Sequence, residues 1–135
     1  MTMLTEMTNA EASSLWSGLL ILLLGLLSIR VTLVNHKHAD ESDTGKNSEV
    51  GRAARVFSNG VEYIPISVGA LILLYHLEVP VTAIHVLGIM LLAGRVVQAV
   101  ALSGSKNGFS TLAGMALTFA AIFTGGGMLV VYAFL

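Results

Sequence analysis

The chain has 135 residues, of which 55% are hydrophobic and only 11% are charged, whereas a soluble domain carries about 25% charged residues. This composition predicts a single domain that lies mostly in lipid. The net charge of −1 gives no electrostatic basis for nucleic-acid binding, and the lack of cysteine excludes a sulfur nucleophile from the protein itself. Any thiol chemistry must therefore use the thiol of a substrate.

The chain opens with a polar segment, residues 1–14, in which Glu6 and Glu11 lie where a secretory signal would carry positive charge. An apolar run follows, with Arg30 as its only charged residue. The run is long enough to cross a hydrocarbon core of about 30 Å. We predict a membrane helix over about 15–36, followed by a solvated linker over 37–50 that is rich in charge, Asn, Ser and Gly.

Three further apolar segments predict three more membrane helices, and the connections between them are short. Short connections make neighbouring helices antiparallel, so the predicted fold is an all-α, integral membrane, up-down four-helix bundle. The remainder of the chain, 15–135, forms the transmembrane domain. Its later helices are expected at about 51–77, 79–102 and 109–135.

The distribution of basic residues predicts the orientation of this bundle. Lys37 and Lys46 lie in the linker and Lys106 lies in the connection before the last helix, with Arg30 and Arg52 near the same surface. The positive-inside rule places this side in the cytoplasm. We therefore expect a multi-pass protein of a cell inner membrane, with both termini in the periplasm.

The second helix carries a polar ridge, because Arg52, Arg55, Asn59 and Glu62 are separated by three, four and three residues. Such residues at membrane depth face the bundle interior, an interface or a wet cleft rather than lipid. One interpretation is an ion-pair ladder that holds helices together. The other is a site for a small zwitterionic ligand such as glutathione, whose carboxylates match arginine forks and whose ammonium group matches a carboxylate.

The segment around this ridge, GRAARVFSNGVEYIP from Gly51 to Pro65, resembles the signature of the MAPEG family, the membrane-associated proteins in eicosanoid and glutathione metabolism. The shared pattern is Arg, three residues, Asn, two residues, Glu-Tyr and then Pro. The resemblance implies that glutathione contacts Arg55, Asn59, Glu62 and Tyr63, and Arg52 adds a further basic position. It also implies a homotrimer that binds its ligand between subunits.

The third helix holds Arg95 and Gln98, which lie one turn apart on a single face. Arg95 has two interpretations: its long stem extends to the cytoplasmic interface, or it lines a ligand cleft beside the ridge. The resemblance favours the cleft, so Arg95 and Gln98 join the candidate binding residues. Gln98 replaces a tyrosine of the family pattern.

The last helix contains no arginine, although the resemblance implies one near its start that stabilises the thiolate of glutathione. A free thiol has a pKa of about 8.5 and needs a positive neighbour to ionise at neutral pH. Lys106 lies in the preceding loop. We assign no catalytic residue, and Arg55 and Arg95 are weak candidates for that role.

These residues predict a MAPEG-like membrane protein of the bacterial inner-membrane type that binds glutathione or a similar thiol and no metal. An enzyme of this kind is a glutathione transferase or peroxidase whose small lipophilic co-substrates arrive through membrane lipid. The alternative is a non-enzymatic membrane protein that binds lipid or a partner protein. His85 lies among apolar residues, and we expect it to hydrogen-bond within the bundle rather than to act in catalysis.

Overall fold

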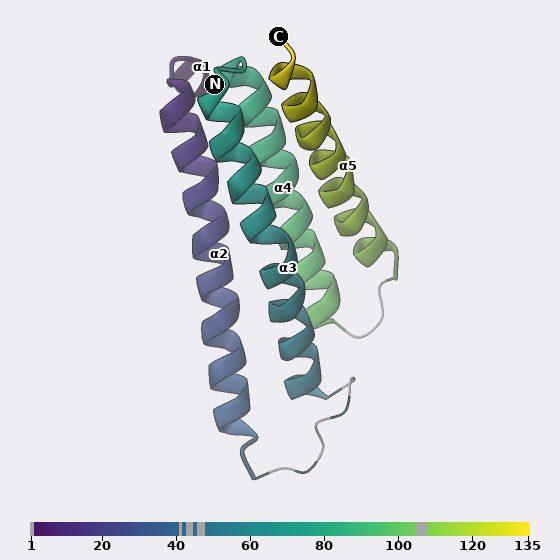
Figure 1. Ribbon diagram of the computed structural model, residues 1–135. Helices are drawn as coiled ribbons and strands as arrows, with labels where there is room; N and C mark the ends of the chain where they lie inside the picture. Colours follow the sequence, from purple (N-terminus) through teal and green to yellow (C-terminus); the bar gives the residue numbers. More distant parts are fainter. Residues whose placement is uncertain (1, 41, 43–44, 46–47, 105–107) are drawn as a thin grey trace.

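The computed structural model describes residues 2–40, 42, 45, 48–104 and 108–135, so Lys46 and Lys106 lie outside the described residues. Four long helices run side by side, and both termini lie at one end of the bundle (Figure 1). The all-α bundle predicted from the sequence is confirmed. The helices are α1 (Thr2–Thr5), α2 (Asn9–Lys37), α3 (Glu49–His76), α4 (Val81–Ser103) and α5 (Gly108–Ala133).

Each of the four long helices is long and apolar enough to cross a membrane. Consecutive helices run in opposite directions, as the short connections predict (Figure 1). Large apolar side chains are exposed along the outside of the bundle, and Leu22, Leu26 and Phe123 are examples. An outer surface of this kind is suited to contact with lipid rather than water.

Helix α2 begins at Asn9, so part of the polar segment 1–14 belongs to the first membrane helix, which we had predicted to start near residue 15. The cause is a capping box. The Thr8 hydroxyl accepts a hydrogen bond from the Glu11 backbone N–H at 3.2 Å, and the Glu11 carboxylate accepts one from the Thr8 N–H at 2.8 Å. These bonds satisfy N–H groups that a helix start otherwise leaves unpaired.

The turn between α3 and α4 lies at the same end of the bundle as the termini (Figure 1). Glu78 adopts a positive φ of 55°, which reverses the chain within a few residues. The side-chain amide of Asn9 donates a hydrogen bond to the Val79 carbonyl at 2.6 Å. This bond holds the start of α2 against the turn.

The core near this end is built around Trp16, which packs directly on Gly88 of α4. The indole N–H of Trp16 donates to Nδ1 of His85 at 3.0 Å, and Nε2 of His85 lies 2.7 Å from the Leu4 carbonyl. Since indole is only a donor and a carbonyl only an acceptor, His85 carries its proton on Nε2. His85 therefore hydrogen-bonds within the bundle, as the sequence predicted.

Candidate functional site

Arg95 is the centre of the polar site, and it points into the bundle instead of reaching for the interface. Its side chain is 3% exposed. The guanidinium donates from Nη1 to the Asn59 side-chain oxygen on α3. It also donates from Nε and Nη2 to the Thr118 hydroxyl on α5, at 3.1 and 2.7 Å. Arg95 thus joins three helices.

An aromatic ring and a sulfur atom complete the surroundings of this guanidinium. The Tyr63 ring centroid lies 4.7 Å from Cζ of Arg95, which is within the range of a cation–π contact. The sulfur of Met115 lies 3.9 Å from Nη2. Tyr63 also packs edge to face on Phe119, with ring centroids 6.0 Å apart. We call Asn59, Tyr63, Arg95 and Thr118 the Arg95 cluster.

No acidic group balances the charge of this cluster within the described part of the chain. Each hydrogen-bond and ring partner of Arg95 is neutral: an amide, a hydroxyl, a thioether and a phenol ring. Neutral donors and acceptors satisfy the N–H groups but do not cancel a positive charge removed from water. The positive charge of Arg95 therefore has no counter-charge among the described residues.

Two glycines bring α4 and α5 close enough to form the cluster. A Cβ atom added at Gly94 would lie 2.7 Å from the Thr118 hydroxyl oxygen and 3.1 Å from the Thr118 backbone nitrogen. A Cβ atom added at Gly114 would lie 2.8 Å from the backbone nitrogen of Gln98. Small residues at such crossings allow membrane helices to approach closely.

Gln98 lies at this crossing, 3% exposed, rather than among the groups that bind Arg95. Its side-chain oxygen accepts no hydrogen bond from the described residues. Arg95 and Gln98 lie one turn apart on α4 and both are buried, as their spacing predicts. The structure brings Arg95, Asn59 and Tyr63 together by direct contact, whereas Gln98 packs against Gly114.

The rest of the ridge lies outside the cluster. Arg52 and Arg55 are half-buried, while Glu62, near the middle of α3, is exposed. Within the described residues Glu62 forms neither an ion pair nor a hydrogen bond, and the buried Nε atom of Arg55 has no acceptor. The ion pairs found among those residues join Glu49 to Lys37 and His38 at the linker end. Within the described residues, Glu62 therefore contributes no ion pair to a ladder along α3.

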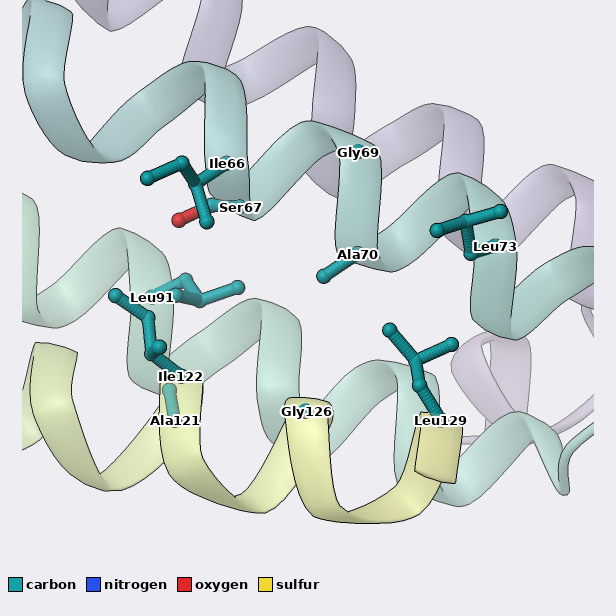
Figure 2. A pocket seen from close by; sticks show the side chains of 10 residues that line it. All are labelled: Ile66, Ser67, Gly69, Ala70, Leu73, Leu91, Ala121, Ile122, Gly126 and Leu129. Carbon is teal, nitrogen blue, oxygen red and sulfur yellow. The ribbon is translucent and has the colours of Figure 1, made fainter. Parts of the chain in front are cut away.

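The space around these residues differs sharply between the two sides of the cluster. Beside Asn59 and Arg95 a cavity of about 10 Å³ is closed by apolar side chains such as Val56, and a cavity of this size holds about one water molecule. One turn beyond Tyr63, a groove of about 320 Å³ opens between α3 and α5 with Leu91 of α4 at its base (Figure 2). The groove is apolar except for Ser67. A tripeptide does not fit inside the cavity of about 10 Å³ beside Asn59 and Arg95.

The contribution of α5 to the site is not predicted from the sequence, because none of its residues that contact the cluster is charged. Thr118, Met115 and Phe119 all contact members of the cluster. The four-residue spacing of Gly114 and Thr118 does predict that α5 closely contacts another helix, because small residues at this spacing are typical of helix contacts in membranes. That spacing does not reveal which side chain lies opposite.

The fold and the site together define a multi-pass helical membrane protein with a buried cationic cluster shared by α3, α4 and α5. Residues 13–131 match the model of the MAPEG family, which is most of the chain. The chain belongs to the MAPEG family. No curated protein and no solved structure matches it.

Proposed function

We propose that this protein binds glutathione or a similar anionic thiol at the Arg95 cluster and the α3 ridge, in a site completed by further copies of the chain. The observation that carries this proposal is the burial of Arg95 among neutral partners. Membership of a family that includes glutathione transferases and peroxidases supports the choice of ligand.

The charge of Arg95 is the first step of the argument. A charged side chain at the centre of a membrane helix costs about 2.5–3.5 kcal/mol on insertion scales. Hydrogen bonds from Asn59 and Thr118 reduce this cost without neutralising the charge. A carboxylate or thiolate from a ligand offsets the remainder, since charge-assisted hydrogen bonds are roughly twice as strong as neutral ones. Glutathione offers two carboxylates and a thiol.

The exposure of Glu62 is the second step. A carboxylate near the middle of a membrane helix is unfavourable when it faces lipid, yet Glu62 is exposed in one chain. A neighbouring copy that covers this face removes Glu62 from lipid and encloses the half-buried Arg55. The family resemblance supports a homotrimer. Glu62 then accepts the ammonium group of glutathione between subunits, and Arg52 and Arg55 bind its carboxylates.

The reaction follows from the chemistry of the thiol. In a transferase, the sulfur of the thiolate forms a bond to an electrophilic carbon of a lipophilic co-substrate, and a leaving group departs or the adduct takes up a proton. In a peroxidase, two glutathione molecules are oxidised to the disulfide while a lipid hydroperoxide is reduced to an alcohol and water. Arg55 and Arg95 are the positive side chains proposed to stabilise the thiolate.

Access for a lipophilic co-substrate is supported by the apolar groove between α3 and α5. The groove is lined by Ile66 and Ser67 (Figure 2). These residues follow Tyr63 by about one turn of α3, so a molecule in the groove is near the proposed thiol site. For orientation, we propose a bacterial-type inner membrane with the linker side in the cytoplasm. Glutathione then enters from the cytoplasm and the co-substrate enters from the bilayer.

A second candidate is a membrane protein that binds lipid without transforming it. Two observations favour it: the groove is apolar over most of its lining, and α5 carries no arginine that could stabilise a thiolate. The two functions differ in whether glutathione binds. A neutral lipid would leave the charge of Arg95 uncompensated.

The test is the effect of glutathione on thermal unfolding of the detergent-purified protein. A ligand that binds only the folded state raises its stability by mass action, by about 2.7 kcal/mol at a hundred times its Kd. We expect stabilisation of the wild type and its loss in Arg55→Ala, with the oligomer intact. Lys37→Ala is the matched control, because Lys37 is an exposed cation paired with Glu49 at the linker end.

Three outcomes separate the functions. Stabilisation that Arg55→Ala abolishes and Lys37→Ala preserves supports the thiol site. No stabilisation of the wild type at millimolar glutathione contradicts it and favours the lipid-binding function. If Arg55→Ala instead loses its oligomeric state and keeps its response to glutathione, the ridge serves assembly rather than ligand binding. Turnover is then measured with a lipophilic electrophile and with a lipid hydroperoxide.

A further inference from the structure

The Thr118 hydroxyl uses all its hydrogen-bonding positions, two toward Arg95 and one toward Gly114. Its side chain is completely buried, on a helix without a charged residue in its described sequence. The hydroxyl oxygen accepts from Nε and Nη2 of Arg95, and the hydroxyl donates to the Gly114 carbonyl at 2.9 Å. A hydroxyl has one donor and two acceptor positions. All three are in use.

The position of this hydroxyl is fixed before any ligand arrives. Threonine is branched at Cβ, and the bond to the Gly114 carbonyl one turn earlier selects one rotamer of its side chain. Gly94 faces the same oxygen so closely that a methyl group there would displace it. The short side chain can reach the guanidinium only because these glycines let α4 and α5 meet.

The guanidinium of Arg95 is consequently held at three of its nitrogen atoms: Thr118 binds Nε and Nη2, and Asn59 binds Nη1. A guanidinium has five N–H bonds. Nε and Nη2 each direct one to Thr118, and Nη1 directs one to Asn59. One N–H of Nη1 and one of Nη2 are left without an oxygen acceptor in the described chain, the latter beside the sulfur of Met115. The plane of the cation is set. One N–H of Nη1 remains for an anion, and the second N–H of Nη2 donates only to the weak thioether acceptor of Met115, which an anion can replace.

We propose that Thr118 is a positioning residue for the ligand site: its hydroxyl orients the Arg95 guanidinium so that the remaining donors meet the anionic group of the ligand. This inference rests on the proposed function for the identity of the ligand. The rival role for Thr118 is structural, in which the hydroxyl only lowers the cost of burying Arg95. The two roles predict different ligand affinities for a variant that lacks the hydroxyl but still folds. A positioning role predicts weaker binding, and a structural role predicts wild-type binding.

The experiment compares Thr118→Val, which removes the hydroxyl at nearly constant shape, with Thr118→Ser, which retains it. Thr118→Ala is measured in parallel, because it places no methyl group against the guanidinium. The matched control is Thr124→Val, the same change at an exposed position of α5. Glutathione affinity is measured by calorimetry on the detergent-purified protein, and the unfolding temperature and oligomer mass are recorded for each variant.

We expect Thr118→Val and Thr118→Ala to bind glutathione at least about tenfold more weakly, because hydrogen bonds to charged groups contribute enough for a change of this size. Thr118→Ser and Thr124→Val should stay within about twofold of the wild type. Wild-type affinity in Thr118→Val, whatever its unfolding temperature, overturns the positioning role. Equal loss of affinity in Thr118→Ser also overturns it.

A second readout needs no glutathione. Hydrogen exchange of the Arg95 Nε–H is followed by ¹⁵N NMR, with the signal assigned by its loss in Arg95→Lys. Exchange should be slow in the wild type and Thr118→Ser and at least about tenfold faster in Thr118→Val. If the wild type binds no glutathione, the proposed function fails, while Thr118-dependent protection still supports the orientation of Arg95. Exchange that is unchanged in Thr118→Val contradicts the inference.

Discussion

Helix α4 buries two side chains that are able to carry a positive charge, and their surroundings differ. His85, toward the end with the termini, is neutral and fully hydrogen-bonded by Trp16 and Leu4. Arg95, toward the linker end, remains a cation among neutral partners. A buried polar group with all its partners is a structural element. We propose that the uncompensated charge marks a binding site, whereas burial of a fully hydrogen-bonded polar residue such as His85 is not by itself a sign of function.

The largest expected effect is that of Arg95→Met, which keeps an unbranched side chain and removes its charge. We expect glutathione affinity to fall by about thirtyfold to several thousandfold, since truncating one partner of a buried charge pair costs about 2–5 kcal/mol and about 1.4 kcal/mol corresponds to tenfold. The lost hydrogen bonds to Asn59 and Thr118 oppose the gain from removing a buried charge, so stability should change by no more than about 1–3 kcal/mol. Calorimetry and thermal unfolding check both parts. A variant that binds normally but unfolds early would make Arg95 structural, like His85.

The next effect concerns the His85 region. A Cβ atom at Gly88 would overlap the indole ring of Trp16, so Gly88→Ala should force Trp16 away from His85. We expect a loss of about 3 kcal/mol, the upper part of the range for overpacked cores, with unchanged glutathione affinity. The control is Gly18→Ala, where the added methyl group has no neighbour within 4 Å. Denaturant unfolding measures the loss, and equal effects of both variants would contradict the packing account.

A smaller loss is expected for His85→Leu. The variant leaves the Trp16 N–H and the Leu4 carbonyl without partners, and an unsatisfied buried group costs about 1–3 kcal/mol. We expect a decrease of about 2 kcal/mol in the free energy of unfolding and no change in ligand affinity. His76→Leu, at the exposed end of α3, is the control. Loss of glutathione binding in His85→Leu alone would show that the two regions of α4 are coupled.

The smallest effect is that of the cap at the start of α2. Thr8→Ala removes the hydroxyl that accepts from the Glu11 N–H, and the expected cost is about 1 kcal/mol. Thr8→Ser keeps the cap and should match the wild type. Hydrogen exchange of the first turn of α2 measures the change locally. Unchanged exchange in Thr8→Ala would mean that packing, rather than the capping box, fixes where α2 begins.

Much of the fold was predictable from the sequence because it depends on local features. The long apolar runs predict four helices, and the short connections predict their alternating directions. The start of α2 was missed, although the order Thr8, Asn9, Ala10, Glu11 fits a capping box. The expected start near residue 15 marks where the chain becomes apolar, whereas the helix itself begins earlier, in the polar segment.

Residue spacing alone predicts the part of the candidate site that lies on α3. The spacing of Arg55, Asn59 and Glu62 places them on one ridge of α3, whatever the other helices do. For Arg95, spacing alone allows two interpretations, because the choice depends on what lies beside α4, and it is the family resemblance that favours the cleft. Thr118 was not found, since its contact with Arg95 arises from the close crossing at Gly94. Spacing within a helix is encoded locally, while pairing between helices is not.

The most direct test of the central claim is a structure of the assembled protein with glutathione, because the claim concerns what neutralises Arg95. We predict one glutathione between adjacent copies, with an anionic group on the free donors of Arg95 and the ammonium group near Glu62. A structure in which a carboxylate of a second copy is paired with Arg95 would contradict the claim. In that case the charge is already balanced by assembly and indicates no ligand.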